Sequence, residues 1–325
     1  MRVMVIGLGS MGKRRIRLIR KYDPAIEIIG IDFKEERRSS CGQEYGIKTF
    51  GDISEGFGYG KIESTFICTS PLSHNKIIAR CLEYGAHVFT ELNLVPDGYE
   101  ENLELAKKKD RLLFLSSTFL YRDEIKKIKS FVEEDASPLN YIYHIGQYLP
   151  DWHPWENYRD FFAGDKRSNG CREIFAIELP WLTETFGEVI EIKTMKDKRS
   201  GLEIDYCDNY QVMLRHSSGC KGLLAVDIIS RKAVRNLEVF GERLYLSWDG
   251  TPTGLYQYDY SEKMNKKIEL YREIDQLENY SSFVVENAYM NEIMEFFHLI
   301  SDGGEQIYGF EKDKKILDLI DRIEA

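Results

Sequence analysis

Three glycines near the start of the chain have the spacing of a phosphate-binding turn. Gly7, Gly9 and Gly12 form a GxGxxG pattern that follows an apolar run and opens an amphipathic helical segment at residue 10. In such a turn the first glycine permits a tight bend, the second lets the backbone approach a pyrophosphate, and the third lets the helix pack on the strand. The helix N-terminus offers free N–H groups to an anion. The pattern predicts a dinucleotide site that includes Gly7, Gly9, Ser10, Met11 and Gly12.

An acidic residue lies at the position where dinucleotide-binding proteins bind the adenosine ribose. Asp32 ends the second apolar run, about 20 residues after Gly12. Its carboxylate can accept hydrogen bonds from ribose hydroxyls and repels a 2′-phosphate, which favours NAD over NADP. Three cations follow closely, at Lys34, Arg37 and Arg38. They either offset this repulsion or form a solvated helix face, so the sequence favours NAD and leaves NADP open.

A second group of chemically active side chains is concentrated in residues 148–162, YLPDWHPWENYRDFF. Aromatic rings offer flat apolar faces for sugar C–H groups, an arginine can hold a carboxylate or phosphate through two parallel hydrogen bonds, and a histidine titrates near neutral pH. The predicted substrate contacts are Trp152, Trp155 and Arg159. The predicted proton carriers are His153 and Tyr158. The alternative is that these rings only pack and that His153 is a structural loop residue.

The elements that must position these residues alternate along the first part of the chain. Apolar runs at 2–7, 26–32, 64–69, 87–90 and 112–116 are separated by helical patterns. Continuously apolar strands that alternate with helices predict a parallel sheet covered on both faces. Later runs, such as 210–214 and 237–240, alternate apolar and polar residues and predict half-buried strands. The chain is expected to be α/β throughout.

Two further segments resemble those of a known family. CTSPLSH follows the third apolar run, at 68–74, and TELNL follows the fourth, at 90–94. Together with the glycine-rich turn, they resemble the glucose–fructose oxidoreductase / inositol dehydrogenase (Gfo/Idh/MocA) family. The resemblance implies a doubly wound Rossmann domain over residues 1–120. It also implies an α/β domain over 121–325 with a large, mostly antiparallel open sheet, whose last helix packs back on the first domain.

The resemblance also implies roles for particular residues and an assembly. The implied cofactor contacts are Thr69, Ser70, Pro71, His74, Glu91 and Asn93, and Tyr121 is an implied substrate contact. Similar proteins often pair through the open sheet, so a homodimer or homotetramer is expected.

The chain departs from this family at both positions that handle protons. The family lysine corresponds to Leu92, which cannot exchange a proton, and the family histidine falls on Ile177 or Glu178. The acidic position of the same segment is Glu173, a third candidate proton carrier. Two more predicted substrate contacts lie in this segment, Arg172 and Glu178. A structural ion pair is the alternative role for Glu173 and Glu178.

Two functions remain open at this point. The first is an NAD(P)-dependent oxidoreductase that transfers a hydride to or from a sugar, amino sugar or sugar-acid derivative, with non-standard proton-handling residues. The second is a non-catalytic dinucleotide- and sugar-binding sensor, or an accessory protein of a carbohydrate pathway. Leu92 and the missing histidine favour the second, and the density of binding-type residues in 148–162 favours the first.

Composition narrows the remaining classes of function. The chain has 325 residues, 44 Lys+Arg against 54 Asp+Glu and a net charge of -10. This length predicts two domains, and the acidic balance argues against a nucleic-acid partner. The six cysteines have no metal or redox spacing, so we expect reduced thiols and no metal site. No signal-peptide pattern or run of about 20 apolar residues is found, so no membrane partner and a cytoplasmic location are expected.

Overall fold

The chain folds as two compact units. The computed structural model describes residues 1–135, 137–154, 156–276 and 281–325. Unit 1 contains residues 1–117 and 289–314, and unit 2 contains residues 118–288 and 315–325. Each unit therefore draws on two separate stretches of the sequence.

Unit 1 is built on a parallel sheet. Among the described residues, its six strands pair in the order β3-β2-β1-β4-β5-β6. The strands are β1 (Arg2–Ile6), β2 (Glu27–Ile31), β3 (Lys48–Phe50), β4 (Ser64–Ile67), β5 (His87–Thr90) and β6 (Leu113–Leu115). The helices are α1 (Ser10–Tyr22), α2 (Glu35–Tyr45), α3 (Ile53–Tyr59), α4 (His74–Glu83), α5 (Tyr99–Lys109) and most of α8 (Glu286–Asp302). This order confirms the doubly wound Rossmann arrangement that the sequence predicts.

The sequence patterns overlook one strand and one helix of this unit. β3 has three residues, each at least partly exposed, and α3 has seven. Elements this short carry little apolar periodicity. The parallel sheet of the described residues therefore has six strands where five were expected.

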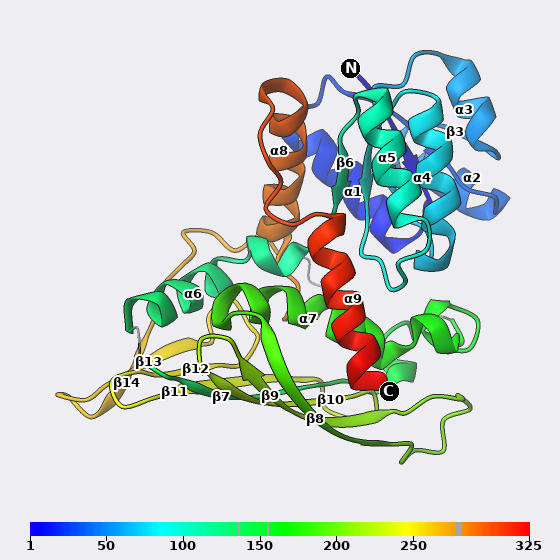
Figure 1. The fold of residues 1–325 in the computed structure, drawn as a ribbon. Helices are drawn as coiled ribbons and strands as arrows, with labels where there is room; N and C mark the ends of the chain where they lie inside the picture. Colours follow the sequence, from blue (N-terminus) through cyan, green and yellow to red (C-terminus); the bar gives the residue numbers. More distant parts are fainter. Residues whose placement is uncertain (136, 155, 277–280) are drawn as a thin grey trace. The chain divides into compact units, whose positions relative to one another are not determined.

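Aromatic rings on neighbouring strands form much of the core of unit 1. Phe66, Phe89 and Phe114 occupy paired positions on β4, β5 and β6, with neighbouring ring centroids 4.7 and 5.0 Å apart. Phe296 of α8 packs edge-on against all three. Figure 1 shows α8 on the side of the sheet opposite to α4 and α5. This packing brings α8, which is remote in sequence, onto the dinucleotide-binding sheet.

Unit 2 is built on a larger, mostly antiparallel sheet. In the described part of the chain its eight strands pair in the order β14-β13-β12-β11-β7-β10-β9-β8, and only β7 and β10 run parallel. The strands are β7 (Asn140–Gly146), β8 (Val189–Asp197), β9 (Asn209–His216), β10 (Lys221–Asp227), β11 (Val234–Phe240), β12 (Tyr245–Trp248), β13 (Leu255–Asp259) and β14 (Met264–Lys267). The predicted second fold is thus confirmed.

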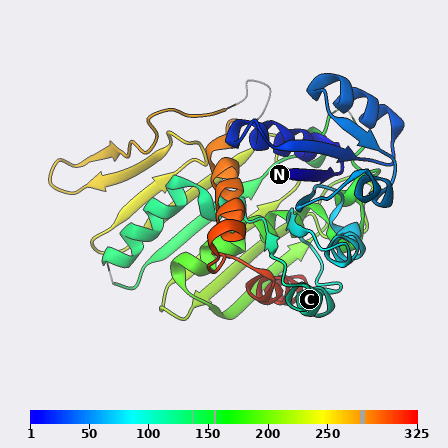
Figure 2. The same cartoon turned by 90° about the horizontal axis from the view of Figure 1, so that it is seen from above.

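Two helices cover one face of this sheet. α6 (Asp123–Asp135) and α7 (Gly170–Phe186) lie over the same face in Figure 1, and Figure 2 shows them crossing over the strands in the second view. Tyr143 of β7 faces α7 and packs edge-on against Trp181. α9 (Phe310–Glu324) contributes its residues from 315 onward to unit 2.

Within unit 2 the opposite face of the sheet carries exposed apolar side chains. Ile142, Met195, Met213 and Leu223 are 44%, 74%, 54% and 43% exposed. They lie on the strands β7, β8, β9 and β10, and those on β7, β9 and β10 alternate with buried residues. This is the open face that the sequence analysis expects to pair copies of the chain, an expectation that stays a prediction.

Candidate cofactor site and active-site residues

The glycine-rich turn has the geometry that a dinucleotide needs. Gly7 has a φ of 92°, which disfavours any residue with a side chain, and its N–H donates to the Ile31 carbonyl at 2.8 Å. A Cβ on Gly12 would lie 1.9 Å from the Gly7 carbonyl oxygen. A Cβ on Gly9 would instead lie in ordinary van der Waals contact with the Arg37 guanidinium, 3.6 Å away. The turn is therefore tightly packed at Gly7 and Gly12 and less tightly packed at Gly9.

The amino terminus of α1 remains available to an anion. Its N-cap is Gly9, which has no side chain to cap the helix, and no acidic residue lies in its first turn. The terminal N–H groups and the helix dipole therefore favour a negative charge here. Ser10 and Met11 occupy the first helical turn, as the sequence predicts. The residues present fit the pyrophosphate of NAD(P).

Asp32 is held at the end of β2 by backbone donors. Its Oδ2 accepts from the Leu8 N–H and its Oδ1 accepts from the Lys34 N–H, both at 2.9 Å. The residue is 5% exposed, and the Arg37 guanidinium lies 3.8 Å from Oδ2. The carboxylate thus ties the glycine-rich turn to the end of β2, where ribose hydroxyls are recognised in this fold.

A buried histidine braces the two segments that suggested the family. His74 Nε2 lies 3.0 Å from the Thr69 carbonyl oxygen, and its Nδ1 lies 2.7 Å from Asn93 Oδ1. Burial lowers the pKa of His74, so the ring acts as a neutral brace. Thr69, Ser70 and the short 3₁₀ turn Pro71–Ser73 lead into α4. His74 therefore positions the turn after β4 and the loop after β5.

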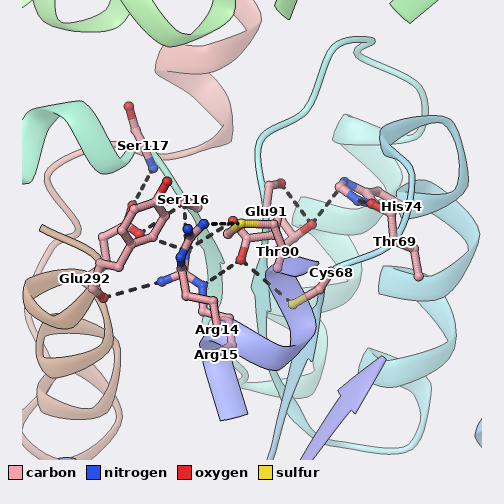
Figure 3. Close-up of polar contacts among 12 residues, drawn as sticks. Arg14, Arg15, Cys68, Thr69, His74, Thr90, Glu91, Ser116, Ser117 and Glu292 are labelled. Atoms are coloured by element: carbon pink, nitrogen blue, oxygen red, sulfur yellow. Dashed lines mark hydrogen bonds and ion pairs between the residues drawn. The ribbon is translucent and has the colours of Figure 1, made fainter. Parts of the chain in front are cut away.

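A buried ion-pair cluster that sequence reasoning misses lies at the carboxyl ends of β4, β5 and β6 (Figure 3). Arg15 of α1 is fully buried and donates from Nε and Nη2 to the two oxygens of Glu91, at 2.6 and 3.1 Å. Its Nη2 also donates to Glu292 Oε2 of α8 at 2.9 Å. Ser116 Oγ and the Ser117 N–H complete the bonds to Glu292, at 2.9 and 2.8 Å.

Two carboxylates, Glu91 and Glu292, share the Arg15 guanidinium in this cluster, and Arg14 is drawn beside them in Figure 3. Burial raises the pKa of Glu292. The Cys68 thiol, 3.8 Å from Glu91 Oε1, also has a raised pKa because it is buried and stays neutral. The cluster fixes the start of the loop that carries Leu92 and Asn93.

Only part of this cluster left a signal in the sequence. Glu91 belongs to the TELNL segment, and Arg15 is a cation on a helix side that packs against the sheet. Glu292 lies in α8, about 200 residues beyond Glu91 along the chain, and nothing in its neighbourhood marks it. Phe296 lies four residues after Glu292 and therefore on the same face of α8. The packing of Phe296 on the sheet brings Glu292 to Arg15.

Two predicted substrate contacts of α7 have structural partners instead. The Arg172 guanidinium binds Asp321 at 2.7 Å and also binds Glu324, both on the α9 segment of unit 2. Glu178 is fully buried and accepts from the Tyr143 hydroxyl and the Trp181 indole. It also pairs with Arg235 of β11 at 2.7 Å. Each side chain is engaged within unit 2, and its role as a substrate contact stays a prediction.

Glu173 is the exception on this helix. In the described part of the chain no hydrogen bond or ion pair engages its carboxyl group, and only its N–H bonds, to the Asn169 carbonyl. Burial raises the pKa of Glu173 to about 8. Glu173 and Ile177 are partly exposed, whereas the residues of α7 next to each of them in sequence are buried. A carboxyl group of this kind can hold or release a proton near neutral pH.

The aromatic loop is partly organised by its own contacts. His153 Nδ1 lies 2.8 Å from Glu156 Oε1, and its ring stacks on Phe161 at 4.7 Å. The Trp152 indole donates to the Gln147 carbonyl at 3.1 Å.

The remaining predicted residues of unit 2 are also placed. The Tyr158 hydroxyl accepts from the Glu203 N–H at 3.0 Å, and the Arg159 guanidinium pairs with the exposed Glu203 carboxylate. Tyr121 is buried at the end of the 3₁₀ turn Thr118–Tyr121. Trp155 lies outside the described residues.

Two classes of feature are not found in the described residues. No group of His, Cys, Asp and Glu side chains could hold a metal ion, and no helix has the length and apolar character needed to cross a membrane. The six cysteines are free thiols.

Comparison with known proteins identifies the family. The model of an oxidoreductase family with an NAD-binding Rossmann fold, Gfo/Idh/MocA, matches residues 1–117. The chain is also 25% identical over 268 residues to myo-inositol 2-dehydrogenase of Thermotoga maritima, which covers 75% of this chain and 73% of that enzyme. Residues 1–117 of this chain thus match the Gfo/Idh/MocA family, and most of the chain is similar to an inositol dehydrogenase. The resemblance seen in the sequence is thereby confirmed.

Solved structures extend the likeness to both units of the chain. Levoglucosan dehydrogenase in complex with NADH has a TM-score of 0.80 and 15% identity, over 100% of this chain and 95% of that one. Biliverdin reductase of Synechocystis, in complex with biliverdin and NADP+, has a TM-score of 0.75 and 16% identity, over 99% of this chain and 97% of that one. At such identities the likeness shows the fold, and the homologues bind NAD(P).

Proposed function

We propose that this protein is an NAD(P)-dependent oxidoreductase that acts on a hydroxyl or carbonyl carbon of a sugar-like or cyclic polyol substrate. The observation that carries the proposal is the dinucleotide cradle of unit 1, where the glycine-rich turn, the amino terminus of α1 with Gly9 as its N-cap, and a fixed Asp32 come together. The similarity to myo-inositol 2-dehydrogenase and to levoglucosan dehydrogenase supports the substrate class.

Bound NAD(P) supplies the hydride acceptor or donor at its nicotinamide ring. The chain's own residues bind the pyrophosphate at Gly9 and the α1 terminus, and Asp32 binds the ribose. His74 and the Arg15–Glu91–Glu292 cluster hold the turn after β4 and the loop after β5 in place. Because such a site must hold its groups to within a fraction of an ångström, this buried bracing serves the cofactor.

We assign the proton step to Glu173. In the oxidative direction, a Glu173 carboxylate oxygen would accept the proton of the substrate hydroxyl, while bound NAD(P)+ would supply the hydride acceptor. In the reductive direction, the same carboxyl group returns the proton to the carbonyl oxygen. Its raised pKa suits both roles. His153 and Tyr158 are weaker candidates, because Glu156, Phe161 and Glu203 already engage their polar groups and ring faces.

The aromatic loop is assigned to substrate recognition. The Trp152 indole N–H is bound to a backbone carbonyl, so the residue offers its ring rather than a donor. Arg159 is half exposed and its partner Glu203 is more exposed still, so water screens this pair and a ligand anion could displace Glu203. These features support an oxygen-rich ligand that carries apolar C–H faces.

The test begins with purified protein. NAD(H) and NADP(H) affinities are measured by calorimetry, and nicotinamide absorbance is then followed with a panel of cyclic polyols, anhydrosugars and sugar acids. Turnover with one of them supports the proposal. We expect Glu173→Gln to lower kcat/KM by about 10²–10⁴-fold, the usual range for acid–base catalysis, while cofactor affinity stays unchanged. Glu188→Gln is the matched control, since Glu188 is exposed and paired only loosely with Lys315.

One observation favours the second candidate function. Leu92 occupies the position of the family lysine, and a leucine neither donates nor accepts a proton. If the protein binds cofactor and a sugar but turns over no member of the panel, the non-catalytic sensor or accessory protein becomes the supported function. If Glu173→Gln keeps full turnover, the proton carrier is another group, and His153→Ala is the next variant.

A further inference from the structure

One tyrosine of unit 2 joins the aromatic loop to the helix that carries Glu173. Tyr206 lies in the β8–β9 loop, residues 198–208, and is 6% exposed. Its hydroxyl donates to the Ala163 carbonyl at 2.5 Å and accepts from the Gly170 N–H at 3.4 Å. Ala163 directly follows the aromatic loop, and Gly170 is the first residue of α7. A single oxygen atom therefore bridges the two segments.

A tyrosine hydroxyl suits this bridge because it can donate and accept at the same time. The Gly170 N–H is one of the amide groups that the first turn of a helix leaves without an intrahelical partner. Burial raises the pKa of Tyr206, so the hydroxyl keeps the proton that it donates to Ala163. A phenylalanine at this position would remove the partner that the hydroxyl gives to two buried backbone groups.

The β8–β9 loop is itself fixed, which holds the Tyr206 hydroxyl in one place. The fully buried carboxylate of Asp208 accepts from the N–H groups of Arg199 and Ser200, at 2.8 and 3.0 Å, and from Ser200 Oγ at 2.5 Å. The Ile228 N–H, just after β10, donates to the Asp208 carbonyl at 3.1 Å. These bonds close the loop at its base and tie it to the sheet.

Two further contacts join the aromatic loop to the same surroundings. The Glu203 N–H of the β8–β9 loop donates to the Tyr158 hydroxyl at 3.0 Å. A Cβ on Gly170 would lie 3.4 Å from the Trp152 ring, so this ring packs against the start of α7. Since the Glu203 bond is exposed to water, the buried Tyr206 bridge is the stronger of the two links to the β8–β9 loop.

We propose that Tyr206 is a positioning residue for the substrate, which holds the aromatic loop against the start of α7. The proposal rests on the proposed function, which assigns substrate recognition to that loop. Glu173 lies on α7, and Asn169 caps this helix by accepting from the Arg172 N–H at 2.7 Å, so the place of Glu173 does not depend on Tyr206. Loss of the Tyr206 hydroxyl should therefore weaken substrate binding and leave the proton step intact.

The test is Tyr206→Phe, which keeps the buried ring and removes only the hydroxyl. The substrate is the member of the sugar panel that the wild-type protein turns over fastest. If nine tenths of the molecules release the aromatic loop, KM and the dissociation constant of this sugar rise about tenfold, because only the remaining fraction can bind. A tenfold change corresponds to about 1.4 kcal/mol, within the usual net contribution of one hydrogen bond. The values of kcat and of NAD(H) affinity should stay unchanged.

Tyr141→Phe is the matched control. Tyr141 is also buried, and its hydroxyl lies 3.0 Å from His216 Nε2. Its ring stacks on Phe186, the last residue of α7, at the end of the helix remote from the aromatic loop. This variant should lower the melting temperature, as Tyr206→Phe does, and leave KM unchanged.

Hydrogen exchange reports on the same bridge without turnover. In Tyr206→Phe the amides of residues 158–168 should exchange faster, whereas those of α7 beyond its first turn should exchange as in the wild type. Ser200→Ala is a second variant, which removes one donor to Asp208 and leaves Tyr206 in place. It should raise KM and speed this exchange to a smaller extent, and it decides the question if Tyr206→Phe does not fold.

Three results would overturn the proposal. The first is an unchanged KM, or unchanged exchange of residues 158–168, in Tyr206→Phe. The second is a fall in kcat as large as the rise in KM, since this would give the hydroxyl a part in the proton step. The third is an equal rise of KM in Tyr141→Phe, which would reflect lost stability alone. If the wild-type protein neither binds nor turns over any member of the panel, the proposed function fails instead, and exchange of residues 158–168 alone decides whether Tyr206 holds the loop.

Discussion

Replacing Arg15 with methionine tests whether the buried cluster of unit 1 depends on a single cation. Arg15 has a fully buried side chain that bonds to Glu91, Glu292, Ser116 and the Tyr289 carbonyl. Its guanidinium also lies over the Phe89 ring, 4.4 Å from the centroid. Methionine keeps much of the apolar contact with this ring and removes the charge and every donor.

The expected cost follows from what the substitution leaves behind. Removing one partner of a buried ion pair costs about 3–5 kcal/mol, because an uncompensated charge remains in the dry interior. At about 2–4 °C per kcal/mol for a unit of this size, calorimetry should show unit 1 melting roughly 6–20 °C lower at pH 7. Hydrogen exchange in α8 should accelerate, because Glu292 is anchored to α1 through Arg15.

The stability of the same variant should depend on pH in a definite direction. Burial raises the pKa of Glu292 in the folded protein, and loss of Arg15 raises it further. The folded variant then binds a proton at Glu292 more tightly than the unfolded chain does, whose glutamate pKa is near 4.3. Acidification below pH 7 should therefore narrow the stability gap between Arg15→Met and wild type, until the pH nears that unfolded-state value.

A double variant provides the control for this reasoning. Arg15→Met/Glu292→Gln removes the second charge and should recover part of the lost stability relative to Arg15→Met alone. Our account of the cluster fails if Arg15→Met costs less than about 1 kcal/mol, which is the range of an exposed pair. It also fails if the cost does not change with pH.

Three further predictions follow from other parts of the molecule. Since burial raises the pKa of Glu173 to about 8, oxidation should speed up and reduction slow down as pH rises through that value, and Glu173→Gln should flatten both profiles of kcat/KM. Gly12→Ala places a Cβ 1.9 Å from a backbone oxygen. It should lower the free energy of unfolding by about 1–3 kcal/mol and weaken dinucleotide binding, measured by calorimetry, more than tenfold. Gly58→Ala, whose Cβ meets open space, should change neither the stability nor the binding. If the open face of unit 2 pairs copies of the chain, Met213→Asp should lower the molecular mass measured by light scattering. Met264→Asp, on the edge strand, should leave that mass unchanged. A monomeric wild-type protein would contradict this expectation.

Much of the fold of unit 1 was predictable because its signals are local. A GxGxxG turn, an acidic residue at the end of the second apolar run and alternating strands and helices are each read within a few residues, and together they specify a Rossmann sheet. β3 and α3 escaped because short, partly exposed elements have no strong period. In unit 2 the alternating strands were readable, but their order depends on pairings between distant segments.

The candidate site divides in the same way. Glycine spacing and Asp32 were sufficient to predict a dinucleotide cradle, because those residue types have few other reasons to occupy those positions. Arg172, Glu178 and Glu173 lie within seven residues of one another in sequence and could not be told apart. Their environments differ. Asp321 and Glu324 bind Arg172, and Arg235 binds Glu178. The carboxyl group of Glu173 has no partner in the described part of the chain.

The sequence by itself predicted the likeness to the family, the class of cofactor and the absence of the usual lysine and histidine, since these predictions depend on which residue types are present and on short spacings. Only the tertiary structure decided which cation lies beside Asp32, which carboxyl group is free to carry a proton, and that Glu292 completes the cluster around Arg15. The physical reason is that charge pairing and desolvation depend on neighbours in space. Packing in the folded chain chooses those neighbours from segments up to nearly 300 residues apart, as in the 277-residue separation of Arg15 and Glu292.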